Sequence, residues 1–470
     1  MPSIDLTALN KDYSVYIPSM QIGSARNLMM PASKWQAAEL PNGLVPSDFN
    51  FLKSTNKHWH YKYALASAET FRGVKNNAVS ARKGGEFILG DSGGFQIGNG
   101  SFKGAADWRG KNEEEISAKW RGSDMREEIV RWCETNCDYA MTIDIPLWCC
   151  DKGTKEKPNN SPFKSVSIGR MIELSVENLQ YLCDVRGRWN GGDHHCKYLN
   201  VLQGNDEAQE QLWFDAVKGF KLDGWSLAGG VGVMGGPYRV LNRLLTMADL
   251  GLLDKGYDWV HLLMLGELRW SPVITSLQRA LRRNVNEKIT ISYDSSSPYI
   301  SAGKFGSYYA STQPDFDNEN WAHKSTKFPS TWGYANSANP MHLNTTMCKG
   351  KHKCVKCQQG QPHLPLAMTS PIASQLTLQE LISDTSKHSR RRVGKLCEEL
   401  LINNNVFEIV YGMIKANDAV FGKTPNAPAV ILEACGAVAD IVGSEKWHSK
   451  LLQHQRLIED AVGFKSKEAV

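Results

Sequence analysis

The chain has 470 residues, of which 41% are hydrophobic and 22% charged, so it can bury a sizeable core as a globular protein. Its net charge of +5 is too small to indicate a nucleic-acid partner by itself. A polar start, no apolar run of about 18 residues and an odd number of cysteines argue against a signal peptide, a membrane span and a secreted disulfide framework. We therefore expect a cytoplasmic protein with no membrane partner.

Short strand-like runs alternate with helical segments through much of the chain. The expected strands, rich in β-branched and aromatic residues, are 87–89, 138–143, 198–202, 224–227, 260–264 and 288–293. Expected helices at 112–135 and 207–220 carry apolar residues at helical spacing. Alternation over roughly 300 residues predicts an α/β protein, and the number of units favours a (β/α)8 TIM barrel over an open doubly wound sheet.

The amino-acid composition of the sequence changes after residue 293. We assign 1–345 to the barrel, with an insertion at 295–345 that is rich in Ser, Asn, Pro, Gly and aromatic residues and is expected to be a long loop. Residues 346–392 contain clustered cysteines and lysines and form an expected zinc-binding subdomain. Residues 393–470 fit helices, broken near 422–428, and form a helical C-terminal region.

Polar groups follow several expected strands, where a barrel carries its catalytic residues. The first set is Asp91–Gln96, a carboxylate followed by Ser, two glycines, Phe and Gln. Asp144 ends the next strand, and Gln203 with Gly204 ends the one after it. Further sets are the glycines at 229–230 and Asp294 with three serines. The sequence thus predicts one site at the carboxyl ends of the strands.

These motifs resemble the tRNA-guanine transglycosylase family. The Asp-Ser-Gly-Gly-Phe-Gln run at 91–96 is the most distinctive part of the resemblance, which covers roughly 85–390. The order of the later motifs agrees: an Asp strand end, Gln-Gly, Gly-Gly, Leu263-Met264, then Asp294. The resemblance implies a pentosyltransferase that exchanges guanine in a nucleic acid for a 7-deazaguanine through a covalent aspartyl–sugar intermediate.

The resemblance also implies a role for each motif residue. Asp294 is the implied nucleophile, and Asp91 is the implied general acid and base. Asp144 is implied to accept hydrogen bonds from the purine N1–H and the exocyclic amine. The other implied substrate-binding residues are Gln203 and the Gly230 amide on the O6 side, Gly229 beside them, Ser92 in support, and Phe95 and Met264 on the two faces of the ring.

Each assignment has a structural alternative. An Asp after a strand is commonly a helix cap, and Phe95 and Met264 lie in apolar runs where plain core packing is an almost equal interpretation. For Asp91 and Asp294 the surrounding motifs favour catalysis.

Three cysteines within ten residues, Cys348, Cys354 and Cys357, predict a structural Zn²⁺ site. The resemblance implies one histidine as the fourth ligand. His388 is the best candidate, and His352 and His363 are alternatives. Lysines around this segment and Arg390–Arg392 form either a phosphate-binding patch or a solvated charged face.

The long insertion, the wider zinc spacing and the lack of a second β-rich domain resemble the branch of the family that acts on DNA, known from phages that protect their genomes from restriction with 7-deazaguanines. DNA is therefore the expected partner, in the cytoplasm of a host cell, and tRNA is the alternative. No acidic residue follows Gly230 within 231–236, which favours the neutral base 7-cyano-7-deazaguanine over an aminomethyl base.

Two further interpretations compete with base exchange. A non-catalytic nucleic-acid-binding subunit of the same family is disfavoured because both Asp91 and Asp294 are present. An unrelated barrel glycosidase would leave the cysteine cluster and the run at 91–96 unexplained. A homodimer is compatible with the sequence.

Overall fold

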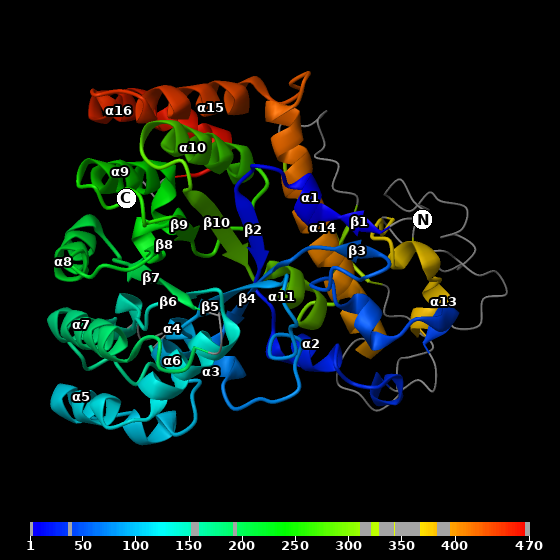
Figure 1. The fold of residues 1–470 in the computed structure, drawn as a ribbon, viewed down its shortest axis with the longest axis horizontal. Coiled ribbons are helices and arrows are strands. Elements are labelled where there is room, and N and C mark those ends of the chain that lie inside the picture. Colours follow the sequence, from blue (N-terminus) through cyan, green and yellow to red (C-terminus); the bar gives the residue numbers. More distant parts are fainter. Residues whose placement is uncertain are drawn as a thin grey trace.

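The computed structural model describes residues 3–35, 40–151, 159–190, 195–310, 321–328, 343, 367–382 and 395–465. Its centre is a sheet of eight parallel strands (Figure 1). In chain order the strands are β2 (Val15–Pro18), β4 (Tyr63–Ser67), β5 (Phe87–Asp91), β6 (Tyr139–Met141), β7 (Lys197–Leu202), β8 (Gly224–Leu227), β9 (Trp259–Leu262) and β10 (Thr290–Ser295). Each strand from β4 to β9 pairs with the next in the chain, and β10 also pairs with β2.

The two ends of this sheet approach each other. Ser19 forms a parallel bridge with Leu65 just beyond β2, and the Met20 amide donates to the Leu65 carbonyl at 2.8 Å. The Ser19 amide also donates to the Ser295 carbonyl at 3.2 Å, on the other side. The sheet is therefore a nearly closed barrel, which confirms the predicted TIM-like architecture.

Helices cover the outside of the barrel. Those of the barrel units are α2 (Ile22–Asn27), α3 (Ala68–Phe71), α4 (Gly94–Asn99), α5 (Glu113–Arg121), α6 (Met125–Asn136), α7 (Ile168–Val185), α8 (Glu207–Val217), α9 (Gly236–Asp249), α10 (Trp270–Asn284) and α11 (Ser297–Gly303). The C-terminal helices are α14 (Lys395–Phe421), α15 (Ala429–Val442) and α16 (Trp447–Val462). In Figure 1, α15 and α16 lie across α10 and α9, and α14 runs beside β2 and α11.

The remaining α-helices and strands of the described part are short. They are α1 (Leu6–Leu9), α13 (Leu378–Ile382), the parallel pair β1 (Ile4–Asp5) and β3 (Trp59–His60), and the antiparallel pair β11 (Ser307–Ala310) and β12 (Lys324–Lys327). None of the helices in the described ranges is long and apolar enough to cross a membrane.

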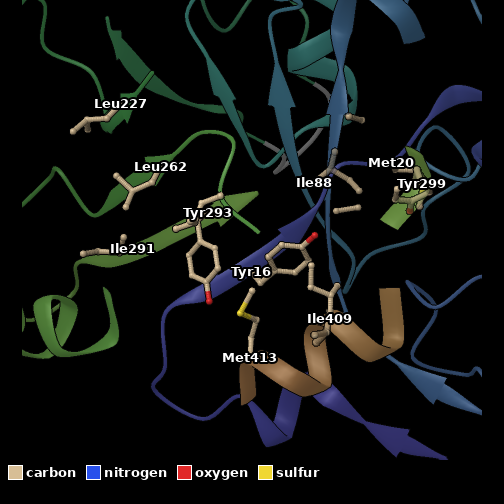
Figure 2. Packing of buried hydrophobic residues seen from close by; sticks show 14 of the residues in the cluster. Tyr16, Met20, Ile88, Leu227, Leu262, Ile291, Tyr293, Tyr299, Ile409 and Met413 are labelled. Carbon is tan, nitrogen blue, oxygen red and sulfur yellow. The ribbon is translucent and has the colours of Figure 1, made fainter. Parts of the chain in front are cut away.

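In β2, β4, β5, β6, β7 and β9, alternate residues belong to two separate clusters of buried side chains. The smaller cluster consists of strand residues and fills the barrel: Val15, Ile17, Leu65, Leu89, Tyr139, Met141, Leu199, Val201 and Trp259. Their neighbours face the helices, as expected for the two-residue period of a strand. In Figure 2, Tyr16 and Tyr293 lie next to each other on this outer side, with Ile409 and Met413 of α14 beside Tyr16. The two tyrosine ring centroids are 5.8 Å apart.

Two strands of the barrel were not predicted. β2 consists of three strong β formers but is only four residues long and ends in a proline, and β4 contains two alanines, which weaken its β propensity. Both are strands because each is paired along its length within the barrel. The predicted helix 112–135 is wrong as one element, because Gly122 ends α5 and α6 begins at Met125.

The insertion predicted at 295–345 is also corrected. Ser295 is the last residue of β10, α11 follows two residues later, and β11 and β12 form an antiparallel pair, so the start of this segment is not a loop. The helical nature of the C-terminal region and its break near 422–428 are confirmed.

Candidate active site

Asp91 and Asp294 lie at the same end of the barrel interior. Asp91 is the last residue of β5, two positions after Leu89 of the interior cluster. Asp294 pairs in register with Ile17, which belongs to that cluster too. Because paired residues of parallel strands project to the same face, both carboxylates lie on the interior face of the barrel, at the carboxyl ends of its strands. Two predicted residues from distant parts of the chain are thus brought together.

The environment of Asp91 favours its protonated form. Burial raises the pKa of the Asp91 carboxyl, and the negative charge of Asp294 raises it further. Hydrogen bonds from the Gly93 amide and the Ser67 hydroxyl act in the opposite direction. A carboxyl group that keeps its proton closer to neutrality can deliver it to a leaving group, as a general acid does.

Asp294 is held by one of its two oxygens. It is 6% exposed, and Oδ1 accepts from the Met264 amide at 3.1 Å and lies 3.3 Å from His261 Nε2. Within the described ranges no residue hydrogen-bonds to Oδ2. Asp294 is therefore fixed in orientation with one oxygen left for other partners.

The amide of Met264 reaches Asp294 through an unusual backbone conformation. Met264 has φ of 65°, in the left-handed region that residues with a side chain avoid, at a cost of about 1–2 kcal/mol. Such strain is common at functional sites, where surrounding contacts maintain it. Here it directs the N–H toward Asp294 Oδ1 while the side chain stays 57% exposed.

His261 is a site residue that the sequence interpretation missed. It lies in β9, has no exposed surface, and connects Ser292 and Asp294 through its two ring nitrogens at 2.8 and 3.3 Å. The sequence did contain an indication of this role. His261 stands two residues after Trp259 in an otherwise apolar strand, so its side chain points into the barrel as that of Trp259 does.

Asp144 follows β6 and is 8% exposed, with a hydrogen bond on each oxygen. The Ser92 hydroxyl donates to Oδ1 at 3.1 Å, and Gln203 Nε2 donates to Oδ2 at 2.8 Å. Burial is the main cause that raises the pKa of Asp144 to about 7, and the charge of Asp91 adds to it. Asp144 therefore belongs to the same electrostatic cluster as Asp91 and Asp294, as predicted for one site.

The glycines of the run at 91–96 permit this close packing. Gly93 has φ of 89°, and a Cβ there would overlap with Glu69. A Cβ on Gly94 would lie 2.9 Å from Asp144 Oδ1 and 3.0 Å from the Asp144 carbonyl oxygen. The absence of a side chain at Gly94 is thus what lets α4 begin beside the Asp144 carboxylate.

Gln203 and Gly230 already have protein partners on the groups expected to contact the base. Gln203 Oε1 accepts from the Leu147 amide at 3.0 Å while Nε2 holds Asp144. The Gly230 amide donates to the Gly204 carbonyl at 2.9 Å. In this arrangement Gln203 positions Asp144, and Gly230 would contact a base only after its hydrogen bond to Gly204 is exchanged. Gly229 lies beside it with φ of 59°.

Phe95 and Met264 are exposed, at 62% and 57%, so the alternative that they are core residues is wrong. The Phe95 ring lies 5.7 Å from the ring of Trp148, centroid to centroid. Phe95 lies in the helix that follows Asp91, and the Met264 amide binds Asp294, so these two exposed apolar side chains follow the strand ends that carry the carboxylates. They offer surfaces on which a planar ring could stack.

The predicted zinc ligands lie outside the described residues. This applies to Cys348, Cys354, Cys357 and His388, and to the alternatives His352 and His363. In the described ranges no group of three or more His, Cys, Asp and Glu side chains is arranged to hold a metal ion.

No protein-family model matches the chain, and no curated protein matches it.

Proposed function

We propose that this protein exchanges a guanine base in a nucleic acid for a 7-deazaguanine through a covalent aspartyl–sugar intermediate. The observation that carries the proposal is that Asp91 and Asp294 both lie on the interior face of the barrel, at the same end, and interact electrostatically. The two carboxyl groups differ in environment, and such a difference suits separate roles as proton donor and nucleophile.

In the first half of the reaction an Asp294 oxygen bonds to the sugar C1′ while the C1′–N9 bond breaks. The electron pair of that bond leaves with guanine, and the Asp91 proton neutralises the departing base. In the second half Asp91 takes a proton from the incoming base, whose N9 bonds to C1′ as the bond to Asp294 breaks. Two inversions at C1′ retain its configuration.

Base recognition centres on Asp144. The target base leaves its stack at a cost of a few kcal/mol, which contacts in the site have to offset. Each Asp144 oxygen has lone pairs beyond those used by Ser92 and Gln203, and these can accept from the N1–H and amine of guanine. Phe95 and Met264, both exposed, would stack on the ring.

The proposed nucleic acid is DNA and the proposed incoming base is 7-cyano-7-deazaguanine, in a role that protects viral DNA from restriction. DNA rests on the resemblance to the DNA-modifying branch, and the neutral base rests on the lack of an acidic residue within 231–236. We also propose that Cys348, Cys354 and Cys357 hold one structural Zn²⁺, which elemental analysis of the purified protein would measure.

A labelled-base assay tests the function. Purified protein is incubated with guanine-labelled duplex DNA or tRNA and with unlabelled 7-cyano-7-deazaguanine, and released guanine and modified nucleosides are measured by mass spectrometry. We expect release of free guanine from DNA, with one modified nucleoside formed for each guanine lost.

Variants of the two carboxylates make the assay specific. Asp294→Asn should abolish exchange, and Asp91→Asn should slow it by about 10²–10⁴-fold. Asp107→Asn, at an exposed aspartate, should leave it unchanged. Exchange in tRNA alone would replace DNA as the substrate, whereas binding without release of guanine from either nucleic acid would favour the non-catalytic subunit.

A further inference from the structure

A chain of hydrogen bonds runs through the barrel interior and ends on Asp294. The Trp259 indole nitrogen is 2.7 Å from Ser292 Oγ, which is 2.8 Å from His261 Nδ1, and His261 Nε2 is 3.3 Å from Asp294 Oδ1. Register explains the alignment, because His261 of β9 pairs with Ser292 of β10 and the other two residues are two positions away along the same strands. All four side chains are buried.

The direction of each hydrogen bond follows from the Trp259 indole at one end of this hydrogen-bond chain. An indole N–H can only donate, so Ser292 Oγ accepts from Trp259. The Ser292 hydroxyl hydrogen is then free to donate to His261 Nδ1, which makes Nδ1 an acceptor. The ring proton therefore resides on Nε2, the nitrogen that faces Asp294. Every polar group in the chain is satisfied in this arrangement.

We propose that His261 is a positioning residue for Asp294, holding Oδ1 so that Oδ2 is the oxygen that bonds to the sugar. The inference rests on the proposed base exchange. Oδ1 receives both N–H groups, from His261 and from the Met264 amide, and Oδ2 is the oxygen without a hydrogen bond from the described residues. The carboxylate therefore meets C1′ with a defined atom.

The same contacts affect the two halves of the reaction differently. When Oδ2 bonds to C1′ and the C1′–N9 pair leaves with guanine, the carboxylate becomes a neutral ester and its hydrogen bonds weaken. When N9 of the incoming base displaces Asp294, the C1′–Oδ2 pair returns to the carboxylate and Oδ1 shares the new charge. Hydrogen bonds to a charged oxygen are roughly twice as strong as those to a neutral one. His261 therefore favours breakdown of the intermediate over its accumulation.

Three substitutions separate this role from a packing role. His261→Phe keeps a ring but removes the N–H. His261→Asn places an amide near the position of Nδ1, within reach of Ser292 only, and His261→Gln places one near Nε2, within reach of Asp294. The Asn and Gln variants are a matched pair, since both bury one amide, and their melting temperatures show whether both fold.

The experiment follows the covalent protein–DNA adduct by intact-mass spectrometry. The adduct forms without an incoming base, and its decay is timed after 7-cyano-7-deazaguanine is added. We expect the Phe and Asn variants to hold roughly ten times more adduct than wild type in steady-state exchange and to release it roughly tenfold more slowly, and Gln to restore the wild-type rate.

Equal decay rates in Asn and wild type, or a Gln variant as slow as Phe, would overturn the role of His261. If the Phe variant does not fold, the Asn and Gln pair decides. Failure of the proposed function looks different, because wild type itself would then form no adduct and release no guanine.

Discussion

Replacing Asp144 with Asn should stabilise the protein and impair base exchange. The pKa of Asp144 is about 7 in the folded protein, against 3.8 for an ordinary aspartate, because burial and the charge of Asp91 oppose ionisation. Between these two pH values the folded state keeps a proton that the unfolded state has lost. Stability therefore falls as the pH rises from about 4 to about 7, and Asp144→Asn removes this loss.

The size of the effect follows from the shift. A difference of about three pH units corresponds to about 4 kcal/mol, fully present above pH 7, and to about 1.4 kcal/mol for each pH unit within the window. Asn can keep both contacts, because the Ser92 hydroxyl can accept from its amide while Gln203 donates to its oxygen. Loss of one acceptor for guanine should lower kcat/KM by roughly 5–150-fold.

Chemical denaturation at several pH values between 5 and 8 provides the assay. The free energy of unfolding of wild type should fall relative to that of Asp144→Asn from pH 5 to about pH 7 and then level off. Parallel curves for the two proteins would refute the reasoning.

Glu399→Gln is a matched control. Burial raises the pKa of Glu399 to about 7 as well, and its partners are Ser24 and Asn27 of α2, each at 2.7 Å. Its shift from 4.5 is smaller than that of Asp144, so this variant should gain about 3 kcal/mol of stability above pH 7 and leave base exchange unchanged.

Three further substitutions probe the geometry of the site. Gly94→Ala should lower kcat/KM by about 10²-fold because its Cβ would displace the Asp144 carboxylate. Gly169→Ala is the control, because no atom lies within 4 Å of its new Cβ. Equal kcat/KM values for Gly94→Ala and Gly169→Ala would contradict this role of Gly94. Phe95→Ala should change the free energy of unfolding by less than about 0.5 kcal/mol, because the side chain is exposed. It should raise KM for the incoming base, since a stacking contact is worth about 1–3 kcal/mol. A large loss of stability would indicate a core role for Phe95. Met264→Gly should raise the free energy of unfolding by about 1 kcal/mol, because glycine adopts the left-handed conformation without strain. It should also weaken base binding, because the exposed side chain is lost. Thermal denaturation measures the first effect and KM the second, and a destabilised variant would argue against strain at Met264.

The carboxylates were predictable because their local sequence carries the signal. Asp91 and Asp144 each follow an apolar run at a strand end, and the glycines after Asp91 indicate a tight backbone. That these residues meet Asp294 follows from barrel closure, which the alternation of strands and helices already indicated.

Features that depend on pairing across strands were not predictable. His261 becomes a site residue only because the β9–β10 register places Ser292 next to it, and a short strand such as β2 forms because β10 pairs with it. Likewise, the Gly230 amide is engaged by Gly204, a contact between two loops that neither loop sequence specifies. The exposure of Phe95 and Met264 is also a property of the closed barrel, since isolated apolar residues are expected in a core.

The residue that bonds to the sugar in the proposed reaction can be identified directly. Wild-type protein would be incubated with guanine-containing DNA without an incoming base, quenched in acid and digested, and the modified peptide sequenced by tandem mass spectrometry. The account predicts a deoxyribose attached to Asp294, and none in Asp294→Asn. Attachment to Asp91 or Asp144, or guanine release with no protein-bound sugar at any time, would contradict it.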